Sequence, residues 1–169
     1  MNYKIFVQII GLIGTCFFFL SYQFKNNKTL FRVQLISYIF YTIHFILLGA
    51  ITGAASYATN LLRSFFLSSE NKKFHEMKFC VLICIIQIAV GIITWKGYIS
   101  LLPMIGNVVL TIGNYTYNPK IIRFTGLFIN SPLWMIHNII VGSIAGIIDE
   151  AVMMLSIIIS LFRFKKTDN

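Results

Sequence analysis

The chain has 169 residues, of which 57% are hydrophobic and only 11% are charged. Soluble domains carry roughly 25% charged residues, and a globule of this length could not bury so much apolar surface, so the composition excludes a water-soluble protein. The net charge of +9 would suggest nucleic acid in a soluble protein, but here the basic residues separate apolar segments, which favours a membrane protein with no nucleic-acid partner.

Apolar segments of roughly the length that crosses a bilayer, about 17 to 25 residues, follow one another along the chain. Polar or turn-forming residues separate them, such as Lys25–Lys28 after the first and Asn118–Pro119 after the fifth. The N-terminal segment lacks a small-residue cleavage site, so we interpret it as a membrane helix and not as a signal peptide. The seven predicted helices cover residues 5–24, 30–48, 53–67, 78–95, 98–117, 121–141 and 143–164.

An internal repeat organises these segments. The stretch from Ile43 to Gly53 has a second copy from Ile136 to Gly146, an offset of 93 residues, and a His, two Gly and three Ile recur in register. Such self-similarity is typical of repeat architectures. We therefore predict an all-α, polytopic fold with a first three-helix bundle in residues 1–70, a cytoplasmic loop and linker helix in 71–97, and a second three-helix bundle with a cytoplasmic tail in 98–169.

The basic residues predict the orientation in the membrane. Of the 14 Lys and Arg residues, all fall on one side of the membrane in this arrangement except Lys4 and Lys96. By the positive-inside rule the richer side is cytoplasmic, which places the N-terminus outside and the C-terminus inside. Because three helices and one linker separate the two copies, both bundles enter the membrane in the same direction, an arrangement known among transporters.

Two glycine pairs lie in the repeated stretch: Gly49 with Gly53, and Gly142 with Gly146. Both pairs match the G-x-x-x-G pattern of helix dimerisation, but that motif is expected in the middle of the membrane. Here each pair lies at an uncharged connection between two helices. We therefore favour hairpin turns, in which Gly supplies a positive φ and lets two helices approach.

The residues that carry a family resemblance are spread along the chain. They are Gln23-Phe24-Lys25, the segment IHFILLGAITGA that begins at Ile43, the pair Asn60 and Arg63, and the C-terminal Glu150, Ile157 and Arg163-Phe164. In these features the whole chain resembles the YgjV-type inner-membrane proteins of bacteria. The resemblance implies a multi-pass protein of the bacterial inner (plasma) membrane, without a settled activity.

A more remote resemblance concerns the layout of three helices, one helix and three helices. It is similar to the SWEET, PQ-loop and PnuC transporters, and Trp134, Asn60 and Asn118–Pro119 loosely match positions near their solute. The first half has no Pro at Tyr22–Gln23, and the position paired with Asn60 is Met153. The resemblance therefore implies a SWEET-like fold but no sugar substrate.

Polar side chains within the predicted helices are candidates for a binding site, because polar groups at membrane depth usually face the bundle interior. An aromatic ring with neighbouring amide and imidazole groups suits a small polar solute. The predicted substrate-binding residues are Asn130, Trp134 and His137 on one stripe of the sixth helix, Tyr41 and His44 in the second, and Asn60 in the third. An alternative stays open for His44 and His137, which could hydrogen-bond helix-end carbonyls beside the hairpins.

Two adjacent acids, Asp149 and Glu150, lie inside the seventh predicted helix. As coupling or gating groups they would take up a proton when desolvated. The alternative is an acidic first helical turn that the helix dipole stabilises, which we favour for Asp149 but not for Glu150. We expect Arg63 to extend toward lipid head groups. The three Cys residues are too isolated from other ligands to predict a metal site, and no cofactor is expected.

The leading functional prediction is a transporter or facilitator that moves a small polar solute by alternating access between the two bundles. The alternative is a non-transporting scaffold or regulatory membrane protein. No nucleophile triad, zinc-protease, P-loop or dinucleotide motif is present, so we do not expect an enzyme. The expected partners are the lipid bilayer and a small polar solute, and the arrangement is compatible with a homo-oligomer.

Overall fold

The computed structural model describes residues 3–142 and 144–165, and this part of the chain contains helices and no strand, which confirms the all-α prediction. The helices are α1 (Tyr3–Ser21), α2 (Asn27–Leu47), α3 (Ile51–Ser68), η1 (Lys72–His75), α4 (Met77–Ile93), η2 (Tyr98–Ser100), α5 (Leu101–Tyr115), α6 (Pro119–Thr125), η3 (Gly126–Asn130), α7 (Ser131–Val141) and α8 (Ile144–Lys165). The π-helical turn η3 joins α6 to α7 without a break, so these three elements form one rod.

Asparagine side chains begin two of the α-helices. The Oδ1 of Asn26 accepts from the backbone N of Thr29 at 3.2 Å, so α2 starts three residues earlier than the sequence predicted. The Oδ1 of Asn118 accepts from the backbone N of Lys120 at 2.9 Å, and Pro119 occupies the first helical position, where its missing N–H costs nothing. Asn-Pro therefore ends one predicted segment and also initiates the next.

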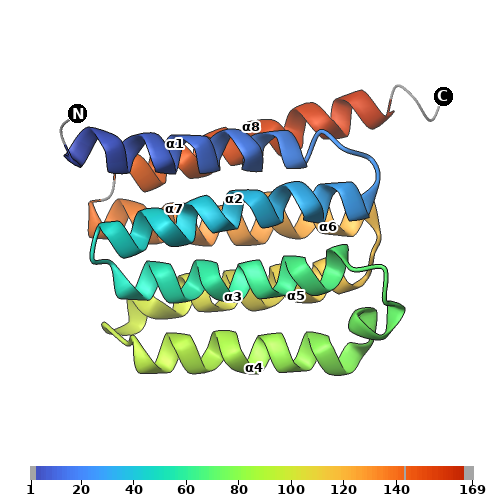
Figure 1. The fold of residues 1–169 in the computed structure, drawn as a ribbon, viewed down its shortest axis with the longest axis horizontal. Helices are drawn as coiled ribbons and strands as arrows, with labels where there is room; N and C mark the ends of the chain where they lie inside the picture. The colour runs from blue at the N-terminus through green and yellow to red at the C-terminus, as the bar shows by residue number, and fades with distance from the viewer. Residues whose placement is uncertain (1–2, 143, 166–169) are drawn as a thin grey trace.

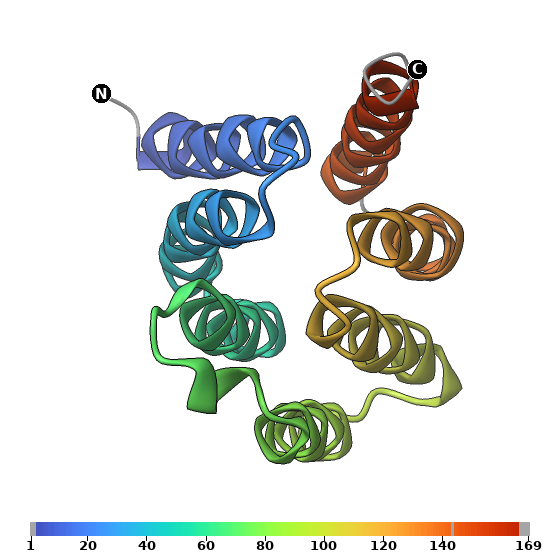
Figure 2. The same ribbon diagram turned by 90° about the vertical axis from the view of Figure 1, so that its right-hand side faces the viewer.

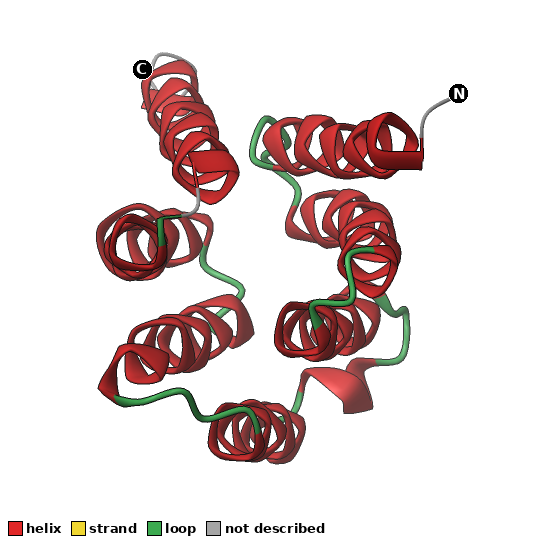
Figure 3. Ribbon diagram, turned by 90° about the vertical axis from the view of Figure 1, so that its left-hand side faces the viewer, coloured by secondary structure: helices red, strands yellow, loops and turns green. Residues whose placement is uncertain are grey.

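The helices form two rows that a single helix joins. Figure 2 shows α1, α2 and α3 in one row, α5, α6–α7 and α8 in the other, and α4 across one end between α3 and α5. At the other end α1 and α8 contact each other, and Figure 3 gives the same arrangement from the opposite side. The colours in Figure 1 show that α1, α3, α5 and α8 run in one direction while α2, α4 and α6–α7 run in the other. Each row therefore begins with a helix of the same direction.

The two copies of the repeated stretch have matching local structure. Gly49 and Gly142 both follow a helix and both have a left-handed backbone, with φ of 71° and 73°. Gly53 and Gly146 lie in the first turns of α3 and α8. A Cβ atom there would come within 2.5 Å of the Phe45 ring and 2.6 Å of the Asn138 side chain, respectively. In each pair the first Gly makes the turn and the second allows close packing, as predicted for the hairpins.

Large apolar side chains cover the outside of the molecule, including Leu12 in α1, Ile51 in α3, Ile93 in α4 and Phe128 in η3. An apolar exterior of this extent is what a bilayer requires. Within the described residues three helical segments are long and apolar enough to span a membrane, namely Tyr3–Ser21, Asn27–Leu47 and Tyr98–Tyr115, while Met77–Ile93 is apolar but shorter. The crossing of all seven rods remains a prediction.

Two buried arginines hold the rows together. The guanidinium of Arg123 in α6 donates to the carbonyl oxygens of Tyr22 at 2.8 Å and Phe24 at 2.9 Å, and its Nε donates to Ser160 Oγ of α8 at 2.9 Å. We call this group the Arg123 anchor. It joins the C-terminal end of α1 to α6 and α8, and the ring of Phe164 lies 4.6 Å from the guanidinium carbon.

The second buried arginine corrects a prediction. Arg63 is fully buried, and it donates to Thr111 Oγ1 at 3.1 Å and to the Tyr38 hydroxyl at 3.0 Å. The expectation that it extends toward lipid head groups is therefore wrong. Its face of α3 meets α5 and α2, where two hydroxyl acceptors are available, so the side chain turns into the bundle.

Candidate functional site

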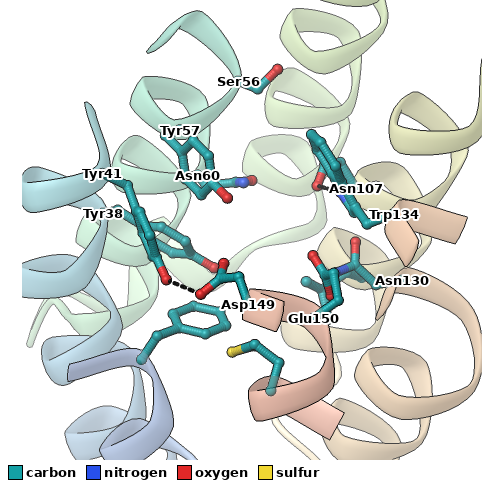
Figure 4. A pocket seen from close by; sticks show the side chains of 13 residues that line it. Tyr38, Tyr41, Ser56, Tyr57, Asn60, Asn107, Asn130, Trp134, Asp149 and Glu150 are labelled. Atoms are coloured by element: carbon teal, nitrogen blue, oxygen red, sulfur yellow. Dashed lines mark hydrogen bonds between the residues drawn. The ribbon is translucent and has the colours of Figure 1, made fainter. Parts of the chain in front are cut away.

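A cavity between the two rows brings together polar side chains from five of the helical rods. Figure 4 shows how ten of its residues face one another. The lining residues of this central cavity are Phe18, Tyr38, Tyr41, Ser56, Tyr57, Asn60, Asn107, Leu110, Asn130, Trp134, Asp149, Glu150 and Met153, with α1, α2 and α3 on one side and α5, the η3–α7 rod and α8 on the other. Its volume is about 30 Å³. Since one water needs about 10–15 Å³, there is room for about two.

Stacked aromatic rings form the wall on the α2 and α3 side. The rings of Tyr41 and Tyr57 are 4.7 Å apart at an angle of 26°, and Phe45 stacks on the far face of this pair, 5.1 Å from Tyr57. Tyr38 lies 6.1 Å from Tyr57. The packing fixes these rings with their hydroxyl groups near the polar centre, so the wall combines apolar faces with polar edges.

Asp149 connects the second row to the first. Its Oδ1 accepts from Thr15 Oγ1 of α1 at 2.8 Å and from the Tyr41 hydroxyl of α2 at 2.7 Å. Both acids lie beyond the first turn of α8, which contains no acidic residue, so the expectation of a dipole-stabilised first-turn acid does not describe Asp149. Two hydroxyl donors hold this carboxylate in place.

Glu150 lies next to Asp149 in sequence but has a different environment. It is 8% exposed, and its Oε2 is a buried atom with no hydrogen-bond partner in the described part of the protein. The Oδ1 of Asn130, also 8% exposed, is likewise unpaired. Gly106 of α5 lies directly beside Asn130, where a Cβ atom would be 3.2 Å from that oxygen. Both unpaired atoms belong to residues that line the cavity.

Amide groups position the remaining polar wall. The indole Nε1 of Trp134 donates to Asn107 Oδ1 at 3.3 Å. Asn60 Oδ1 accepts from Gln87 Nε2 of α4 at 3.2 Å, and Gln87 Oε1 accepts in turn from Thr111 of α5 at 3.0 Å. These bonds connect α3, α4 and α5, and they hold the amides of Asn60 and Asn107 at the cavity surface.

The structure places six of the residues predicted for binding or coupling around one cavity. They are Tyr41, Asn60, Asn130, Trp134, Asp149 and Glu150. The two histidines lie outside its lining. His44 Nδ1 is 2.8 Å from the carbonyl oxygen of Val7, and a Cβ atom at Gly11 would come within 3.0 Å of its ring, so His44 packs α2 against α1. His137 contacts the Trp134 ring edge to face at 5.6 Å.

The sequence reasoning missed four polar lining residues, Tyr38, Ser56, Tyr57 and Asn107. Two of them had a detectable signal: Tyr38 precedes Tyr41 by three positions and Tyr57 precedes Asn60 by three, which is the spacing of one helix face. Asn107 is the first amide in an apolar segment, and polar residues in such segments usually face the interior.

The comparisons with known proteins give one match. The family model Imp-YgjV, described as a bacterial inner membrane protein, matches residues 5–168. No curated protein and no solved structure matches the chain.

Proposed function

This chain belongs to the YgjV family of bacterial inner membrane proteins, and from that premise we propose that it is a transporter or facilitator of a small polar solute, without enzymatic activity. The solute would bind in the central cavity and reach either side of the membrane by alternating movement of the two rows of helices. In this proposal all seven rods cross the bilayer as two parallel three-helix bundles joined by α4, in a SWEET-like layout.

The observation that carries the proposal is the polar lining of the central cavity by both rows. Tyr41 and Asn60 come from the first row, and Asn130, Trp134 and Glu150 come from the second. Transporters built from repeats bind their solutes near the midplane at the interface of the repeats. A scaffold, which is the alternative function, gains nothing from buried acceptors without partners, because each one costs roughly 1–3 kcal/mol.

The hydrogen bonds between the rows indicate how access could alternate. Asp149 joins α8 to α1 and α2 at the level of Thr15, while the Arg123 anchor and the bond from Gln23 Nε2 to the Ser156 carbonyl (3.0 Å) join the rows at the C-terminal end of α1. Release of one set while the other remains would open the cavity to one side. With room for about two waters, the cavity in the described conformation holds no more than a small polar group.

The proposal is tested by the accessibility of Ser56, which lines the cavity. In a background with Cys16, Cys80 and Cys84 replaced by Ala, a Ser56→Cys variant should react with a membrane-impermeant thiol reagent from either side of oriented membrane vesicles. The control is Ser69→Cys in the loop after α3, which should react from one side only.

Reaction of Ser56→Cys from both sides requires a cavity that opens alternately. If this position never reacts while Ser69→Cys does, the interior is permanently packed and the scaffold function is the correct one. Reaction from a single side would likewise contradict alternating access. If the protein forms a homo-oligomer, we propose that each subunit contains its own central cavity and transports independently.

A further inference from the structure

The charged groups of the central cavity are all acidic. Asp149 and Glu150 line it, and no Lys, Arg or His is among the lining residues of the described chain. The buried Arg63 is not among these lining residues, and its two terminal nitrogens donate to Thr111 and to the hydroxyl of Tyr38. A solute with a negative charge would meet only carboxylates here, and in a dry site that repulsion is not screened.

The unpaired atoms of the cavity indicate what the solute must donate. Glu150 Oε2 and Asn130 Oδ1 are both acceptors, both residues are only 8% exposed, and both line the cavity. A carboxylate oxygen without a partner in a buried site is costly unless a donor arrives. The missing groups are therefore N–H or O–H donors, and opposite Glu150 a positively charged donor gives the strongest bond.

The walls also fit a cation. The indole of Trp134 lines the cavity together with the two acids, and aromatic faces attract ammonium groups within about 6 Å of the ring centre. Space for about two waters suits a single –NH₃⁺ group and excludes a bulky head group in this conformation.

We propose that the central cavity binds the primary ammonium group of a small organic cation, with Glu150 as its counter-ion and Asn130 Oδ1 as a second acceptor. This rests on the proposed transport function and assigns its class of solute. Asp149 has a different part, because its Oδ1 already accepts from Thr15 and Tyr41 and thereby orients the aromatic wall. The ammonium group neutralises the Glu150 carboxylate and supplies a donor to its unpaired Oε2, so binding needs both its charge and its N–H donors.

Binding can be followed by tryptophan fluorescence, because the chain has two Trp residues and Trp134 is in the cavity wall. The Trp95→Phe variant keeps Trp134 as the single reporter, since Trp95 lies beyond the end of α4. Purified protein in phospholipid nanodiscs is titrated with methylammonium chloride. Tetramethylammonium chloride has the same charge but a larger head group and no N–H, so it tests size and donors together, and sodium chloride controls for charge and ionic strength.

We expect a saturable fluorescence change with methylammonium and none with the other two salts. Glu150→Gln should weaken methylammonium binding at least tenfold, which is about 1.4 kcal/mol. The matched control is Glu76→Gln, the same chemical change at an exposed residue that pairs with Lys78 outside the cavity, and it should bind as the parent does.

The cation series uses the parent protein, so it decides the question even if Glu150→Gln does not fold. A saturable response to sodium or tetramethylammonium equal to that of methylammonium, or unchanged binding by folded Glu150→Gln, would overturn the ammonium assignment. Alternating accessibility at Ser56→Cys without methylammonium binding would refute this assignment and leave transport standing. Methylammonium binding together with reaction of Ser56→Cys from one side only would refute alternating access and leave the ammonium assignment standing.

Discussion

The carboxylate of Glu70, in the loop between α3 and η1, receives hydrogen bonds from two cations of α2. Lys28 Nζ donates to Oε2, and Arg32 donates to Oε1 at 2.7 Å. The hydrogen bond from Lys28 is the largest cause that lowers the pKa of Glu70, and the charges of Lys28 and Arg32 add to it. The contacts are exposed, so their contribution to stability is small.

A lowered pKa in the folded protein fixes the sign of the pH dependence. The stabilisation by Glu70 is fully present above the unfolded value of about 4.3 and is lost as the pH falls through the folded pKa. We predict that the melting temperature of the parent falls slightly more between pH 6 and pH 3 than that of Glu70→Gln, measured in the same detergent. An equal fall in both proteins would show that the contacts with α2 do not form.

Single residues were predictable from sequence where their chemistry is costly in a membrane. Glu150 and Asn130 were expected to face the interior, and they do, whereas Asp149 was expected to be an acid of the first helical turn and also lines the cavity. The partner of each could not be predicted, because it depends on how the rows meet. Asp149 receives two hydroxyl donors and Glu150 Oε2 none, although the residues are adjacent in sequence. Arg63 was misassigned for the same reason.

Among the elements, the hairpins α2–α3 and α7–α8 depend on glycine at one position each. Gly49 and Gly142 have positive φ, and the space that a Cβ would occupy has no atom within 4 Å, so alanine would meet strain but no clash. We predict that Gly49→Ala and Gly142→Ala each destabilise the protein by about 1–2 kcal/mol, the usual cost of a left-handed conformation for L-residues.

Thermal or denaturant unfolding of the purified protein measures both effects. The control is Thr52→Ala, an exposed position of α3 beside the first hairpin, which should change stability by less than about 0.5 kcal/mol. Unchanged stability in both glycine variants would mean that the chain turns by another route at these positions.

The π-helical turn η3 is an element that the hydrophobic pattern did not predict. It places Asn130 against Gly106 of α5, and Pro132 follows it in the first turn of α7. The spacing of apolar residues can locate a helix within a segment, but it does not reveal the single extra residue that a π-helical turn contains. Such turns are frequent at functional sites, and this one carries an unpaired acceptor of the cavity.

At the scale of the whole molecule, the distribution of basic residues predicts seven crossings with the N-terminus outside. Cysteine labelling in intact cells tests this prediction at the loop after α3 and at the loop after α4. Gly97 is unsuitable for the second label because its φ is 96°, whereas the neighbouring Tyr98 is 86% exposed. Tyr98→Cys should react with an impermeant reagent and Ser69→Cys should not. If Ser69→Cys reacted and Tyr98→Cys did not, the N-terminus would be cytoplasmic and the predicted topology would be wrong.

The correspondence between the two rows could be predicted from the sequence, because the internal repeat shows which hairpins are equivalent. The identical use of Gly49 and Gly142, and of Gly53 and Gly146, follows directly from the offset. The contacts between the rows did not follow, because they join residues that occur once. The pairing of Gln23 with Ser156 has no counterpart among the repeated positions.

The Arg123 anchor has a consequence for biogenesis. The carbonyl oxygens of Tyr22 and Phe24 obtain their donor from a residue about a hundred positions later, at separations of 101 and 99. At a synthesis rate of about 5–20 residues per second, roughly 5–20 s pass between the synthesis of these two residues and that of Arg123. In the predicted topology the end of α1 lies at the membrane surface, where water or lipid head groups would solvate these carbonyl oxygens during that interval. This topology therefore implies that the end of α1 stays near the interface until the second half of the chain is inserted and Arg123 binds it.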